Sequence, residues 1–237
     1  LLDRAQELGM DALAITDHGN MFGVIDFYKQ AQKRGIKPIL GCEVYMAQGG
    51  MEEKTNESRE YSHLILLAKN NCGYQNLMKL VSLGYLKGYY YKPRIDYKTL
   101  LAYGEGLICL SACLAGDLPR YLLEGQEEKA RKLAKTLKAA FGEDYYIELQ
   151  DHNLMEQKMV TPKLIALAKE LDIPVVATND VHYVNKEDAM AHEVLMCIQM
   201  NKKLADDKRL TFETQEFYLK SEEEMNEKFS YVKEALE

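Results

Sequence analysis

Short apolar segments alternate with helical patterns along most of this 237-residue chain. Strand-like segments occupy residues 13–16, 38–45, 63–68, 106–110, 145–149 and 174–177. Helical patterns lie before, between and after them, at 1–8, 21–34, 74–86, 117–123, 126–141, 154–171 and 186–199. Because strands separated by helices usually pair in parallel, the alternation predicts a parallel sheet and an α/β fold.

The positions of polar residues distinguish a closed barrel from an open sheet. Side chains able to bind a metal follow nearly every predicted strand, which suits a ring of strands whose loops meet at one mouth. An open sheet would gather them at one switch point, and the sequence has no G-x-G-x-x-G or Walker loop. The chain opens in a helical pattern with no strand before it. We therefore predict a closed (β/α)7 barrel whose first strand is missing from this chain.

Charge and cysteine content narrow the function classes. The net charge of −7 argues against a broad nucleic-acid-binding face, which would be basic, but it is compatible with a local basic patch. The five cysteines include no C-x-x-C pair, which indicates reduced thiols and no disulfide framework. The sequence contains no signal peptide and no apolar run of about 18 residues, so it predicts a cytoplasmic protein that is not anchored in a membrane.

The last part of the chain differs in composition from the rest. After about Asn201 the sequence is polar and strongly charged. We predict that residues 1–200 form the barrel domain and that residues 201–237 form a linker or the edge of a following domain.

Two short motifs follow predicted strands and carry metal-binding side chains. His18 follows the first strand, and Asp17 beside it could orient the imidazole through a hydrogen bond. Asp180 and His182 follow the last strand, and two residues that are two apart in extended backbone point to the same side. Each motif could equally be a polar turn that caps a strand, so neither identifies a metal site alone.

Three further candidates lie within or next to apolar segments. Glu43 is inside a predicted strand, where a carboxylate is costly unless a cation or an ion pair compensates it. His63 begins a strand and could be a buried structural histidine, and Cys113 could act as a small apolar residue. His152 and His192 are weaker candidates still, and we expect His192 to be structural or partly exposed.

The stretch from Gly88 to Asp96 has three tyrosines among basic residues. Aromatic and basic side chains together can bind single-stranded nucleic acid. The alternative is a loop whose tyrosines pack on the edge of the barrel, and the acidic overall charge favours this alternative.

Five stretches of the sequence together resemble one family. They are Ile15 to Asn20, Gly41 to Tyr45, Gly88 to Asp96, Leu110 to Gly116 and Ala177 to Tyr183. The family is the polymerase and histidinol phosphatase (PHP) domain at the N-terminus of bacterial replicative DNA polymerase III alpha subunits. The resemblance covers nearly the whole chain, and the tail from Arg209 to Lys220 resembles the segment that leads toward the polymerase core.

The resemblance implies a distorted barrel with up to three Zn or Mn ions at its mouth. The matching metal ligands are His18, Glu43, His63, Cys113, Asp180 and His182, and the predicted catalytic residues are Asp17, His18, Asp180 and His182. The family implies metal-assisted phosphoester hydrolysis, in some polymerases as a 3′–5′ exonuclease on a DNA primer terminus. In other members the barrel is a silent scaffold that supports the polymerase core and binds a proofreading exonuclease subunit.

The sequence departs from the family at its first motif, a His-x-His pair on strand one, because the chain begins after it. We therefore expect weak or partial metal binding and no robust phosphoesterase activity from these 237 residues alone. A third possible function is a free-standing enzyme like histidinol phosphatase, which the charged tail and the stretch from Gly88 to Asp96 disfavour.

Overall fold

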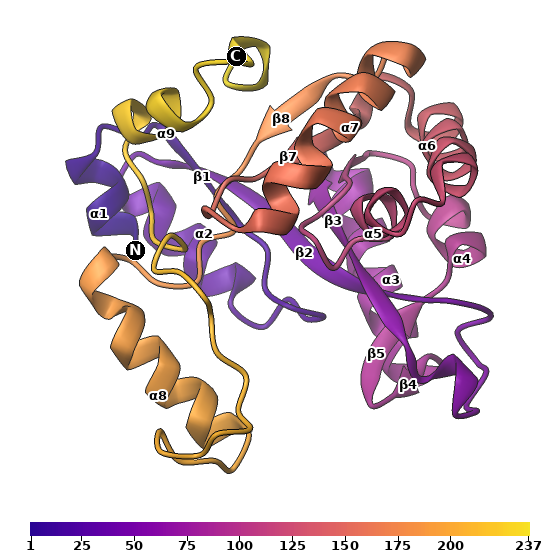
Figure 1. The fold of residues 1–237 in the computed structure, drawn as a ribbon, viewed down its shortest axis with the longest axis horizontal. Coiled ribbons are helices and arrows are strands. Elements are labelled where there is room, and N and C mark those ends of the chain that lie inside the picture. The colour runs from indigo at the N-terminus through magenta and orange to yellow at the C-terminus, as the bar shows by residue number, and fades with distance from the viewer.

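A computed structural model describes all residues from Leu1 to Glu237 and shows one twisted sheet with helices around it (Figure 1). The strands are β1 Ala12–Ile15, β2 Lys37–Ala47, β3 Tyr61–Ala68, β4 Tyr89–Tyr90, β5 Lys92–Ile95, β6 Leu107–Leu110, β7 Tyr145–Leu149 and β8 Val175–Ala177. The α-helices are α1 Leu2–Glu7, α2 Val24–Lys33, α3 Asn71–Leu86, α4 Tyr97–Ala102, α5 Asp117–Leu123, α6 Glu127–Phe141, α7 Met155–Leu171, α8 Ala189–Gln199 and α9 Glu222–Lys228.

The long strand β2 organises the sheet. Its first half pairs in parallel with β1, and its end pairs in parallel with β5. Its other neighbour is β3, after which β6, β7 and β8 follow in order. All the predicted strands are present, and the α/β class is confirmed.

The prediction of an all-parallel sheet was wrong at β3. This strand runs antiparallel to both of its neighbours, β2 and β6. The reason is the connection from β2 to β3, which is a loop over residues 48–60 with one short 3₁₀ helix and no crossover helix. Such a loop can reverse the chain, whereas a parallel pair needs a crossover of about a dozen residues or more, usually helical.

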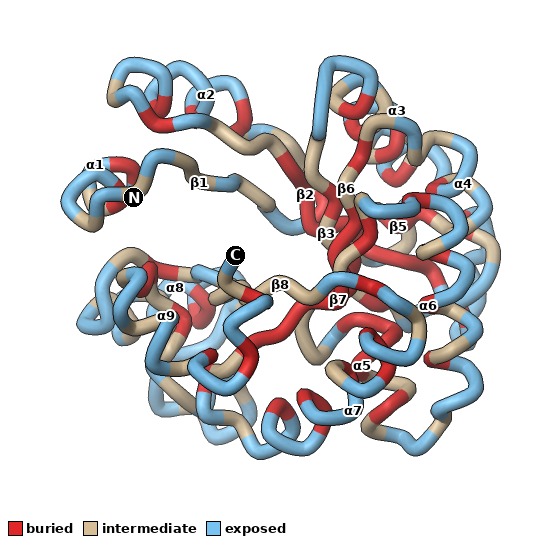
Figure 2. The backbone as a smooth tube through the Cα atoms, turned by 90° about the horizontal axis from the view of Figure 1, so that it is seen from above, coloured by how far each residue is buried: buried red, intermediate tan, exposed pale blue.

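The sheet does not close on itself. β1 pairs with β2 alone, and β8 pairs with β7 alone. Figure 2 shows β1 and β8 on the two sides of the open part of the ring. The sheet is therefore an open half-barrel, which is consistent with the predicted distorted barrel.

A buried arginine fixes the loop at residues 48–60, which the sequence predicts as a loop. Arg94 in β5 is fully buried, and its guanidinium donates to backbone carbonyls of Met51, Glu53 and Ser58. Its Nε–H also donates to the carbonyl of Gly88, at 3.2 Å. The hairpin of β4 and β5, which the sequence analysis did not predict, is thereby joined to this loop.

The main hydrophobic core lies between the sheet and helices α3 to α7. Phe229, Val232 and Ala235 near the C-terminus belong to this same core. A smaller cluster packs α1 and α2 against β1 and the start of β2. The division of the chain at residue 200 stays a prediction. No helix combines the length and the apolar character needed to cross a bilayer.

Candidate metal centre

Two histidine side chains meet at one buried carboxylate. Glu43 in β2 is 3 % exposed, and its Oε2 lies 2.5 Å from Nδ1 of His18. Its Oε1 lies 2.8 Å from Nδ1 of His63 in β3. The ligand atoms of the three residues all lie within 4.8 Å of one another. A carboxylate and two imidazoles at this spacing could hold a metal ion.

Strand alternation explains why Glu43 reaches the site. Successive side chains of a strand point to opposite faces. Cys42 and Val44 belong to the hydrophobic core, so Glu43 and Tyr45 face the other way. His18 is placed next to Glu43 because the N–H of Gly19 donates to the carbonyl of Glu43, at 2.8 Å.

Gly19 permits this close approach. Its φ of +67° lies in the left-handed region that favours glycine. A Cβ at this position would lie 2.6 Å from the ring of Tyr45. A larger residue would therefore push His18 away from Glu43.

The carboxylate at the centre of the cluster is held as an anion. Burial by itself would raise the pKa of Glu43, but the hydrogen bonds from His18 and His63 outweigh it and lower that pKa to about 2. The hydrogen bond to Glu43 in turn raises the pKa of His18. A metal ion bound by neutral imidazoles would offset the same negative charge, so the donor set fits a metal.

Three more predicted residues lie at the same place. The Sγ of Cys113 is 3.8 Å from Nδ1 of His63. Oδ1 of Asp180 is 3.7 Å from Nδ1 of His182. The ring of His18 is 5.7 Å, between centroids, from both His63 and His182. Burial raises the pKa of Asp180 and of Cys113. The fold therefore brings all six predicted ligands together, and their role as ligands stays a prediction.

Asp180 and His182 do meet, but the extended backbone predicted for them is not observed. Asp180 has a φ of +46° and lies in the loop after β8. This loop is held by the N–H of His182, which donates to the carbonyl of Phe217 at 2.8 Å. Asn179 also donates its side-chain amide to the carbonyl of Tyr218.

Asp17 has a different place from the one predicted. Its backbone carbonyl accepts from the N–H of Glu43 at 3.1 Å, and its carboxylate lies beside Gly23. No hydrogen bond joins that carboxylate to His18, so the contacts do not support the predicted orienting role. His152 is fully buried and hydrogen-bonded to Asn179 and Gln157, as a structural histidine would be.

Sequence reasoning missed several neighbours of the site. Phe212 and Phe217, from the tail predicted as a linker, lie 4.9 and 5.5 Å from the ring of His182. Glu148 in β7 is buried and accepts from Thr178 and Gln150, and burial raises its pKa to about 7. A carboxylate in the apolar segment 145–149 was a signal of the same kind as Glu43.

Comparison with known proteins places this geometry in a family. The family model described as PHP domain matches residues 1–152. A DNA polymerase III subunit alpha from Treponema pallidum is 51 % identical over 237 residues, which cover 99 % of this chain and 20 % of that protein. One from Borreliella burgdorferi is 48 % identical over 239 residues, 100 % of this chain and 21 % of that protein. The chain thus spans about a fifth of the length of the curated relatives it matches.

Among solved structures, an amidohydrolase from Chromobacterium violaceum superposes with a TM-score of 0.51 at 15 % sequence identity, over 76 % of this chain and 80 % of that one. This likeness shows the fold alone. The family match over more than half of the chain, together with the high identity to the polymerase subunits, shows that the chain belongs to the PHP domain family.

Proposed function

We propose that this chain is the PHP domain of a DNA polymerase III alpha subunit and that its site hydrolyses phosphoester bonds with the help of metal ions. The observation that carries the proposal is the meeting of His18 and His63 at the carboxylate of Glu43, with the other three metal-capable side chains beside them, namely Cys113, Asp180 and His182. The match of 99–100 % of this chain to about a fifth of the polymerase alpha subunits supports the first part. In the whole subunit the substrate would be a DNA primer terminus, and the location would be cytoplasmic.

The donor set is consistent with Zn or Mn. Imidazole, thiolate and carboxylate ligands suit Zn, and carboxylate with imidazole also suits Mn. Glu43, His18 and His63 would hold one ion, and Cys113, Asp180 and His182 would complete a cluster of up to three. When bound, such ions lower the pKa of a coordinated water and stabilise charge on phosphate oxygens.

The protein residues would position the metal ions. Glu43 accepts from His18 and His63 and so fixes both rings in the site. Asp180 has left-handed backbone, and Nδ1 of His182 lies 2.7 Å from the carbonyl of Asp180, which fixes the direction of the imidazole and leaves Nε2 for a metal. Asp180 and His182 would therefore act in catalysis as metal ligands.

The test uses the whole subunit that carries this chain. Asp180→Ala and His182→Ala should each reduce the rate of metal-dependent 3′–5′ hydrolysis of a primer terminus by at least about 100-fold. The rate of nucleotide addition should be unchanged. Asp172→Asn, an exposed carboxylate at the end of α7, is the matched control. Metal content by mass spectrometry should fall in the two site variants alone.

Two outcomes would count against the proposal. If hydrolysis persisted in both site variants with any separate proofreading subunit absent, the activity would lie elsewhere. If the wild-type subunit bound metal but never hydrolysed a phosphoester, the domain would be a scaffold for the polymerase core and a proofreading subunit.

A further inference from the structure

Three exposed aromatic side chains form one surface beside the metal centre. Phe22, Tyr85 and Tyr89 are 82 %, 40 % and 51 % exposed, and we call them the aromatic surface. The ring of Tyr85 lies 6.3 Å from Phe22 and 6.2 Å from Tyr89, between centroids. They come from three separate elements: the loop after β1, the end of α3, and β4. The sequence analysis favoured tyrosines packed on the barrel edge, but Tyr89 is half exposed.

The loop after β1 connects this surface to the metal centre. The N–H of Phe22 donates to Oδ1 of Asn20 at 3.0 Å. The side-chain amide of Asn20 donates to the backbone carbonyl of His18 at 3.1 Å. Phe22 is therefore held in a turn that begins at a predicted metal ligand.

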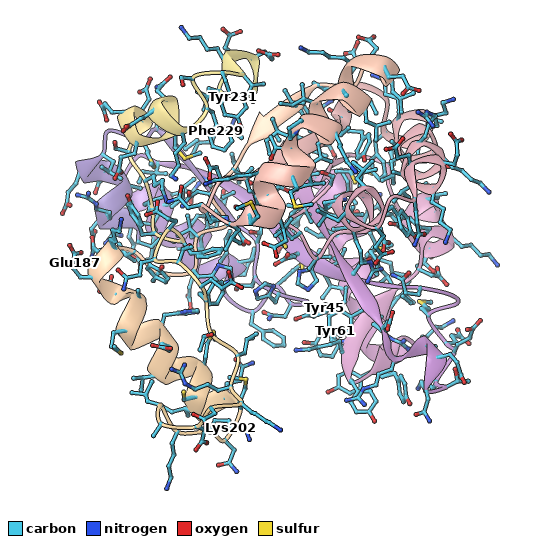
Figure 3. All side chains as sticks on the ribbon, in the orientation of Figure 1. Tyr45, Tyr61, Glu187, Lys202, Phe229 and Tyr231 are labelled. Carbon is cyan, nitrogen blue, oxygen red and sulfur yellow. The ribbon has the colours of Figure 1, made fainter.

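The hairpin of β4 and β5 makes the second connection. Tyr89 pairs across the hairpin with Pro93, whose Cγ lies 3.1 Å from the place where a Cβ of Gly19 would be. Between the hairpin and the site lies Tyr45, whose ring is 6.5 Å from the ring of His18. Tyr45 is found next to Tyr61 at the lower end of the sheet in Figure 3.

One unpaired cation lies on this path. Nζ of Lys92 is 5.2 Å from the ring centroid of Tyr45 and forms no ion pair with a carboxylate. Lys87 lies near the aromatic surface but is 3.7 Å from Oε1 of Glu52, which offsets its charge. The surface is therefore mainly aromatic, with a single free positive charge on the side of the metal centre.

We propose that the aromatic surface binds an unpaired stretch of nucleic acid by base stacking and directs its end to the metal centre. Bases of an unpaired strand expose flat faces that stack on tyrosine and phenylalanine, whereas those faces are covered in a duplex. Lys92 would contact a backbone phosphate next to the site. The inference rests on the proposed function, because it names the form of the substrate that the phosphoesterase site would receive.

The test measures binding of a short fluorescein-labelled oligothymidylate to this chain by fluorescence anisotropy. The double variant Tyr85→Ala/Tyr89→Ala should bind at least about 10-fold more weakly, because each stacked base contributes a factor of this order or more. The double variant Tyr85→Phe/Tyr89→Phe keeps the rings and should bind within about 2-fold of wild type. Tyr231→Ala is the matched control, since Tyr231 is 60 % exposed and lies at the opposite end of the molecule (Figure 3).

Further measurements separate the possible failures. A duplex of the same sequence should bind at least about 10-fold more weakly than the single strand, and salt should have a shallow effect because few phosphates are neutralised. Equal binding of duplex, or unchanged binding by the alanine variant, would overturn the proposal. Concentration-dependent dimers that disappear in Phe22→Ala, with unchanged oligonucleotide binding, would show that the surface docks a second copy and would also overturn it.

The result can be told apart from a failure of the proposed function. Zn binding by the whole subunit, followed by calorimetry, tests the metal centre without using the aromatic surface. Ring-dependent oligonucleotide binding by this chain, together with a whole subunit that binds no metal, would leave this inference standing and count against the phosphoesterase. Metal binding by the whole subunit, with no oligonucleotide binding by this chain, would support the metal centre and overturn this inference.

Discussion

Glu43 shows what one residue can reveal about a site before a structure is known. A carboxylate between Cys42 and Val44, which are both core residues, is costly unless a partner compensates it. Its position in an apolar segment was visible in the sequence. Its partners were not, because His18 and His63 reach it only through the pairing of β2 with the chain on its two sides.

The same limit applies to the turn at Asp180. The sequence identified Asp180 and His182 as neighbours with metal-binding side chains. It did not predict the left-handed backbone at Asp180 or the support from Phe217, because both depend on how the distant tail packs. Residue types could be predicted here, and the geometry that joins them could not.

The first prediction concerns the pH dependence of stability in the metal-free protein. The pKa of Glu43 falls from an ordinary 4.5 to about 2 in the folded state. Its contribution to the free energy of unfolding is therefore present above pH 4.5 and is lost as the pH falls toward 2. His18 has a raised pKa, so its contribution is present below 6.5 and is lost as the pH rises through the raised value. Glu43→Gln should remove both of these pH dependences and lower the free energy of unfolding by about 2–3 kcal/mol near pH 5.5.

The measurement is Tm against pH in the presence of a chelator, for the wild type and for Glu43→Gln. Glu227→Gln, at an exposed position on α9, is the control and should follow the wild-type curve. A Glu43→Gln curve parallel to the wild type from pH 2.5 to 8 would show that the two imidazoles do not stabilise the carboxylate.

At the scale of elements, the period of the hydrophobic pattern predicted whether a segment is a helix or a strand better than it predicted which strands pair and in which direction. Each of the six predicted strands exists within a residue or two of its predicted limits. The short strands β4 and β5 and the short helices α4 and α9 were missed, because elements of two to seven residues give few positions in which a period can show. The direction of β3 was missed because it depends on the loop before it and not on its own residues.

The second prediction concerns the packing of α3 on the turn before β6. A Cβ at Gly73 would lie 1.8 Å from the carbonyl oxygen of Gly106, a contact that backbone atoms must move to relieve. Gly73→Ala should therefore destabilise the protein by about 3 kcal/mol or more, at the upper end for overpacking. Urea denaturation measures the loss.

A substitution on the outer face of the same helix is the control for Gly73. Ser82 in α3 is exposed, so Ser82→Ala should change the free energy of unfolding by less than about 0.5 kcal/mol. Equal midpoints for Gly73→Ala and Ser82→Ala would mean that α3 does not approach Gly106 this closely in solution.

At the scale of the whole molecule, the fold could be predicted from the alternation of elements and the resemblance to a family, but the path of the tail could not. The charge of residues 201–237 suggested a linker or the edge of a following domain, and Phe229, Val232 and Ala235 enter the main core. Charge patterns describe the exposed residues of such a segment. A few apolar residues at the right spacing decide whether it packs.

The last prediction follows from the open sheet. The outer edges of β1 and β8 carry backbone N–H and C=O groups with no strand beside them. Such edges are templates for pairing with another chain unless a charged side chain blocks them. The 237-residue chain should therefore associate as its concentration rises, as measured by sedimentation velocity.

Ala14→Lys, which places a charge at an exposed position of β1, should shift the association constant at least about 10-fold toward monomer. Ala139→Lys adds the same charge on the exposed side of α6 and should leave the association unchanged. A wild-type chain that stays monomeric at every concentration would show that the two edges are covered by other means, and equal effects of the two lysines would show that association depends on net charge and not on the edge of β1.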